Sequence, residues 1–165
     1  MTDKQTVLKQ LGEHVPLGKF SEEYKNDKEI VLAAVRVTEE NLRYASENLK
    51  GDRDVVLEAL KGYHTALKYA DKTILSDRDF MHEACKFEPW SLQYASDAIK
   101  SDREIVLMCV EQSWQCLEFA DKTLRGDRKI VTNAVKINGQ ALEYASEELQ
   151  NDPALKKMAE EDDWP

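Results

Sequence analysis

Apolar and polar residues recur along this chain with a period of 25 residues, five times in succession and without an insertion. The second place of every copy is aspartate, the seventeenth is leucine, the nineteenth is aromatic and the twentieth is alanine. A fixed period of this size predicts one structural unit stacked on copies of itself, because a single unit cannot bury its own apolar face. The copies span residues 26–50, 51–75, 76–100, 101–125 and 126–150.

Each copy opens with a pattern that predicts a helix from its second to its eleventh place. In the first copy Ile30, Val31, Ala34 and Val35 carry the apolar side chains, and this spacing puts a broad stripe on one helix face. The aspartate before them, Asp27, is a residue type that accepts hydrogen bonds from the free amide groups of a first helical turn.

A joint follows at places twelve to fifteen, and a second short helix is expected to begin near place fifteen. Its apolar residues in the first copy are Leu42, Tyr44 and Leu49. Place 21 is serine or aspartate in every copy. Both residue types cap helices, which favours a break there and a new final turn. The alternative is an exposed polar position on a continuous helix.

The two ends of the chain are expected to cap the stack. Residues 1–25 hold a degenerate copy, and Asp152 with Pro153 predicts the start of a last helix, which then turns polar. We therefore expect an all-α solenoid of five 25-residue helical hairpins. Its predicted parts are an N-terminal capping repeat (1–25), the tandem repeats (26–150), and a C-terminal capping helix with an acidic tail that contains Trp164 (151–165).

Charge and hydropathy narrow the classes of partner. The net charge is -9, with no visible basic patch, so a nucleic-acid backbone would be repelled and we expect no nucleic-acid partner. The longest apolar run, residues 30–35, is far too short to cross a bilayer, so we expect no membrane partner. The amino-terminal residues lack the apolar core of a classical secretion signal.

The chain contains three cysteines, Cys85, Cys109 and Cys116. An odd number without a disulfide pattern predicts free, buried thiols in a reducing compartment, either the cytoplasm or a host cytosol into which the protein is delivered. His82 and Cys85 are spaced as two ligands on one helix face. However, the cysteines occupy places where other copies carry core residues, so we expect no metal and no cofactor.

Motifs of enzymatic chemistry are missing from the sequence. It contains no glycine-rich phosphate loop, no nucleophile elbow and no paired-histidine helix motif. The many carboxylates are explained by helix caps and by the surface, so no acid–base pair stands out. We expect a protein that is not an enzyme.

The joint is where the copies differ most. The three middle copies place Tyr63, His64, Phe87, Trp90 and Trp114 there. Stacking would align the joints along one edge, and tryptophan and tyrosine dominate interface hot spots, each worth about 2 kcal/mol or more when central. We predict a surface that binds a protein or peptide, centred on Trp90 and Trp114. The alternative is that Phe87 and one tryptophan fold back over the helix ends.

A basic residue follows the aspartate in every copy, and three interpretations of this basic row remain open. The row could form ion pairs between copies, it could serve only capping and solubility, or it could bind an acidic partner. Its members are Lys28, Arg53, Arg78, Arg103 and Arg128.

At residues 102–107 (DREIVL) and 134–142 (AVKINGQAL) the chain resembles a bacterial and protist repeat family known as domain of unknown function 4116. The resemblance covers residues 26–152. It implies a repeat protein without an assigned activity and without catalytic residues to transfer. The family occurs in multi-repeat proteins, some of which look like secreted effectors of intracellular bacteria.

Together these patterns predict a non-enzymatic scaffold for protein–protein interaction, with a bacterial secreted effector as one setting. A structural or regulatory module that acts by self-association, as a homo-oligomer, is the first alternative. A small metal or ligand site around Cys85 and Cys109 is the second.

Overall fold

The structure is a computed structural model, and it describes residues 3–161. These residues form helices and no strand, so the chain is all-helical, as predicted. Trp164 and the end of the acidic tail lie outside the described residues. The chain divides into two compact units, Met1–Phe80 and Met81–Pro165, and the division falls within one helix.

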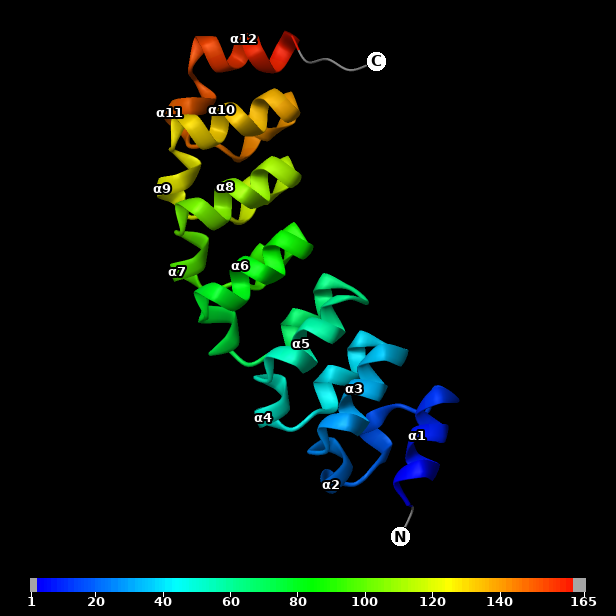
Figure 1. The fold of residues 1–165 in the computed structure, drawn as a ribbon. Helices are drawn as coiled ribbons and strands as arrows, with labels where there is room; N and C mark the ends of the chain where they lie inside the picture. Colours follow the sequence, from blue (N-terminus) through cyan, green and yellow to red (C-terminus); the bar gives the residue numbers. More distant parts are fainter. Residues whose placement is uncertain (1–2, 162–165) are drawn as a thin grey trace. The chain divides into compact units, whose positions relative to one another are not determined.

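The α-helices labelled in Figure 1 are interspersed along the chain with short 3-10 helices, which are named η here. The first unit contains α1 (Lys4–Gly12), η1 (Leu17–Lys19), α2 (Glu22–Lys25), α3 (Lys28–Val37), η2 (Glu39–Tyr44), α4 (Glu47–Lys50), α5 (Arg53–Leu60), η3 (His64–Tyr69) and η4 (Ile74–Ser76). Helix α6 (Arg78–Phe87) contains the division between the units. The second unit continues with η5 (Pro89–Tyr94), α7 (Asp97–Lys100), α8 (Arg103–Gln112), η6 (Trp114–Phe119), α9 (Lys122–Arg125), α10 (Arg128–Ile137), η7 (Gly139–Tyr144), α11 (Glu147–Gln150) and α12 (Pro153–Glu161).

Each regular copy consists of a ten-residue α-helix, a six-residue 3-10 helix and a four-residue α-helix, as α8, η6 and α9 illustrate. The predicted second helix is therefore a 3-10 helix, a form that suits short connecting segments. The predicted break at place 21 is confirmed, because Ser46 is extended and α4 begins at the next residue. The residues 51–75 depart from this order, since α5 has eight residues and η4 stands in place of the last α-helix.

The extended residue at place 21 links neighbouring copies through the main chain. The amide N–H of Ser46 donates to the carbonyl oxygen of Lys25 at 2.9 Å, and that of Asp71 donates to Lys50 at 3.0 Å. In the second unit the corresponding bonds run from Asp121 to Lys100 (2.9 Å) and from Ser146 to Arg125 (2.8 Å). A continuous helix would have used these amide groups internally.

The core is built from the first helix of each copy. All side chains at places five, six, nine and ten are at most 2% exposed, which confirms the predicted stripe. The leucine at place seventeen is fully buried in four copies, and Cys85, Cys109 and Cys116 are core residues with 0% exposure. The stripe members are Ile30, Val31, Ala34, Val35, Val55, Val56, Ala59, Leu60, Phe80, Met81, Ala84, Cys85, Ile105, Val106, Cys109, Val110, Ile130, Val131, Ala134 and Val135.

The aspartate at place two binds two kinds of partner at once, amide groups of its own helix and a cation of the preceding copy. The carboxylate of Asp127 accepts the amide N–H groups of Lys129 (2.9 Å) and Ile130 (3.1 Å), and it pairs with Arg103 of the preceding copy at 2.9 Å. The same ion pair joins Lys4 to Asp27, Lys28 to Asp52 and Arg128 to Asp152, at 2.6 to 2.9 Å. The interpretation of the basic row as ion pairs between copies is thus confirmed for Lys28, Arg103 and Arg128.

These ion pairs favour the charged form of the aspartates. The guanidinium of Arg128 is the main cause that lowers the pKa of Asp152, to about 2, and the amide groups of α12 act in the same direction. The guanidinium of Arg103 likewise lowers the pKa of Asp127. The stabilising charge is therefore present at neutral pH and is lost only as the pH falls through these low values.

Helix α12 approaches η7 so closely that only glycine fits in η7 at the point of contact. A Cβ atom on Gly139 would overlap the carbonyl oxygen of Ala159 in α12. Leu155 of α12 is only 2% exposed, so α12 buries its apolar residue as a capping helix must. The predicted boundaries of the capping parts stay predictions.

Removing the aspartate should cost more than removing its cationic partner. We expect Asp127→Ala to lower the free energy of unfolding by about 1–2 kcal/mol, because a helix cap and an ion pair are both lost. Arg103→Met removes only the exposed pair and should cost less than about 1 kcal/mol. Urea unfolding of both variants measures the difference, and an equal loss would show that the cap contributes nothing.

Candidate functional site

The joints of neighbouring copies lie next to one another within each unit. The residue at place 13 is extended, as at Ser113, so the chain turns between the first helix and the 3-10 helix. In the second unit η5 packs against η6 and η6 against η7, and in the first unit η2 packs against η1 and η3. We call the residues at places twelve to fifteen of one unit its joint edge.

In the first unit the joint edge presents a pair of aromatic rings. Tyr63 is 60% exposed, and its ring centroid lies 5.2 Å from that of His64 at an interplanar angle of 31°. Both residues follow Gly62, beyond the early end of α5 at Leu60. The predicted residues Tyr63 and His64 therefore lie together on the surface.

In the second unit the joint edge presents two apolar side chains at the same place of different copies. Phe87 ends α6 with 61% exposure, and Ile137 ends α10 with 45% exposure. Gln112 holds this place in the copy between them and donates to the carbonyl oxygens of Cys85 and Met108, both at 3.3 Å. Phe87 does not fold back over the helix ends. A search for aromatic residues misses Ile137, although its place in the repeat is the same as that of Phe87.

The two tryptophans of the joint edge are half-buried rather than exposed. The ring centroid of Trp90 lies 5.7 Å from that of Phe119, nearly edge-on at 63°. Trp114 lies 6.1 Å from Tyr144 at 33°. Both partners hold place nineteen of the following copy, so each tryptophan helps to hold two copies together. Their role in binding stays a prediction.

The three buried thiols are chemically quiet. Burial raises the pKa of the Cys116 thiol to about 12, and the contact with Cys85, together with burial, raises the pKa of the Cys109 thiol. All three cysteines are free. Within residues 3–161 no three histidine, cysteine or acidic side chains are grouped so that they could hold a metal ion. The spacing of His82 and Cys85 is thus not completed by further ligands in this part of the chain.

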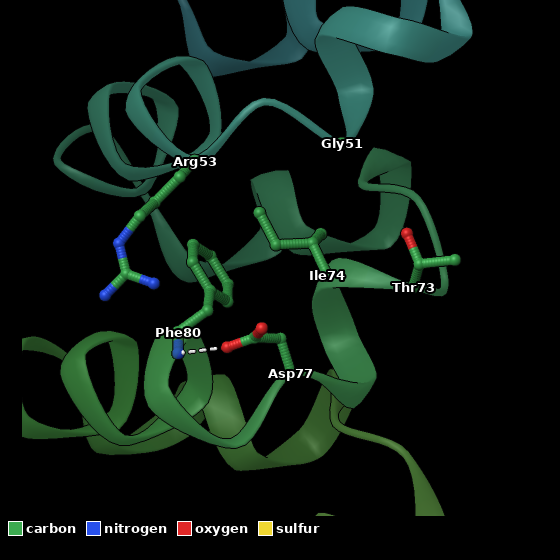
Figure 2. A pocket seen from close by; sticks show the side chains of 6 residues that line it. All are labelled: Gly51, Arg53, Thr73, Ile74, Asp77 and Phe80. Atoms are coloured by element: carbon green, nitrogen blue, oxygen red, sulfur yellow. Dashed lines mark hydrogen bonds between the residues drawn. The ribbon is translucent and has the colours of Figure 1, made fainter.

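A cavity of about 330 Å³ lies in the first unit (Figure 2). The guanidinium of Arg53 lies 5.7 Å from the centre of the Phe80 ring, and the carboxylate of Asp77 accepts the Phe80 amide N–H at 2.7 Å. Asp77 thereby caps α6, while Phe80 and the nearby Ile74 are buried core residues. Asp77, Phe80 and Ile74 thus have structural roles in the repeat.

In the part of the chain that the structure describes, no helix combines the length and the apolar character that crossing a bilayer requires.

The half-buried Trp90 and the exposed Phe87 should respond differently to truncation of their side chains. We expect Trp90→Ala to lower the free energy of unfolding by about 1–3 kcal/mol, because it removes the contact with Phe119. Phe87→Ala should change it by less than about 0.5 kcal/mol, because that side chain is mostly in water. Urea unfolding tests both. A larger loss for Phe87→Ala would contradict the geometry of this edge.

Comparison with known proteins gives a single kind of result. The family model described as domain of unknown function (DUF4116) matches residues 7–47, 36–75, 77–125 and 127–159. No curated protein and no solved structure matches this chain. The matched segments do not follow the five predicted copies one by one, so the number of repeats stays a prediction. They cover most of the sequence, and the chain therefore belongs to the DUF4116 family.

Proposed function

We propose that this chain is a non-enzymatic helical-repeat scaffold that binds a protein or peptide on a joint edge. The copies would continue as an α-solenoid of five 25-residue units, which gives such an edge its length. One observation carries the proposal. The large hydrophobic side chains that are exposed in the described part of the chain, Tyr63, Phe87 and Ile137, are all at places twelve or thirteen.

Single exposed apolar residues are common on protein surfaces and need no explanation. Here the distribution is informative, because among the described residues the large apolar side chains outside the joint are buried or half-buried, and exposed ones occur only at the joint. Trp90 and Trp114 belong to the joint edge of the second unit and are half-buried on rings of the following copy, and such rigid aromatic residues are typical of interface hot spots. The buried free thiols fit the reducing compartment expected from the sequence.

The joint edge of the second unit offers the sharper test. We expect the native chain to capture a protein from a cytosolic lysate, and the variant Phe87→Ser with Ile137→Ser to capture at least about tenfold less. Phe87 is 61% and Ile137 45% exposed, so the variant should keep its helical circular dichroism. The matched control, Ala98→Ser with Lys129→Ser, changes two exposed residues outside the joint and should capture as the native chain does.

Equal capture by the variant and the native chain would contradict a site on this edge. Light scattering of the same samples tests the alternative function, self-association. A mass that rises with concentration in the native chain but not in the variant would favour self-association through the same residues.

A further inference from the structure

The charged residues of the second joint edge follow a pattern of their own. Lys86 precedes Phe87, Lys136 precedes Ile137, and Glu111 precedes Gln112 between them. All three charged side chains are exposed. Along the described residues none of the three takes part in an ion pair. The edge therefore presents cation, anion and cation in turn, with an apolar side chain beside each cation.

The corresponding residues of the first unit behave differently. Arg36 and Lys61 hold the same place in their copies, and both pair with the carboxylate of Glu58, at 2.8 and 2.7 Å. A basic residue in the last turn of a helix interacts favourably with the helix dipole. This effect alone would explain the presence of a basic residue at this place in four copies. It does not explain why Lys86 and Lys136 stand without a carboxylate partner, each beside an exposed apolar residue, in a chain of net charge -9.

The packing of the second unit fixes the spacing of the two apolar side chains. Helix α8 lies between α6 and α10 (Figure 1), and the side chain of Gln112 bonds to the carbonyl oxygen of Cys85 in α6 at 3.3 Å. Packed helices lie 8–10 Å apart, so Phe87 and Ile137 are separated by roughly 16–20 Å. An extended peptide covers this distance with about five or six residues. Side chains alternate along such a peptide, so two that face the same way are about six residues apart.

We infer that the joint edge of the second unit binds an extended peptide with two apolar anchors six residues apart, each two residues from an acidic residue that faces the same way. The anchors contact Phe87 and Ile137, the two carboxylates pair with Lys86 and Lys136, and a basic or uncharged side chain faces Glu111. This inference rests on the proposed function and names the chemistry of its partner. The charges set which peptide binds and how fast, while the apolar contacts supply most of the affinity.

Two fluorescent eleven-residue peptides test the inference by fluorescence anisotropy at low ionic strength. The first has leucine at positions 3 and 9, glutamate at both ends and lysine at position 5, so that all of these side chains face the same way. The second has the same leucines but lysine at both ends and glutamate at position 5. We expect the native chain to bind the first peptide at least about tenfold more tightly than the second, with a preference that falls as salt rises.

Charge reversal on the protein supplies the decisive comparison. The variant Lys86→Glu with Lys136→Glu should prefer the second peptide, and Phe87→Ser with Ile137→Ser should weaken binding of both peptides about tenfold. Lys122→Glu with Lys129→Glu changes the same charges on exposed residues outside the joint. This control should keep most of the native preference.

Equal binding of the two peptides by the native chain, no binding of either, or a preference that Lys86→Glu with Lys136→Glu leaves unchanged would each overturn the inference. Failure of this inference can be told apart from failure of the proposed function. Capture that depends on Phe87 and Ile137 but not on the two lysines would leave a binding edge whose partner has a different charge pattern.

Discussion

The packing of each copy on its neighbours is the interaction on which this structure depends. No helix among the described residues exceeds ten residues, and helices of this length are marginal alone in water. The first helix of each copy buries its stripe completely, which requires a neighbouring copy on the other side. The aspartate at place two and the amide at place 21 then fix how neighbours meet, through an ion pair and a main-chain hydrogen bond.

These contacts limit which places of the repeat are available to bind a ligand. A residue such as Asp127 caps a helix and also contacts the neighbouring copy. It is therefore not available to select a ligand. The joint lies between the elements that make these two contacts, so its exposed side chains, such as Phe87, are not needed for them. Phe87 and Ile137 are exposed there, while Trp90 and Trp114 each have their ring against an aromatic ring of the following copy. The places that all copies share thus stabilise the stack, and we propose that the exposed places of the joint serve recognition.

The sequence predicts the first helices, their buried places and the break at place 21 because these features repeat with a clear period and clear cap residues. It does not predict that residues such as 39–44 form a 3-10 helix, because six residues are too few to separate a period of 3.0 from one of 3.6. Nor does it predict how deep each joint residue lies. The burial of Trp90 depends on Phe119 in the following copy, and the exposure of Ile137 depends on where α10 ends.

Amide hydrogen exchange of the native chain tests the dependence of each copy on its neighbours most directly. The amides of Ser46, Asp71, Asp121 and Ser146 lie outside helices, and each donates to the preceding copy. If neighbouring copies stabilise one another, these amides should exchange as slowly as those of the buried first helices, because both open only when the contact is lost. Exchange at the rate of exposed turns, with the first helices still protected, would contradict the account.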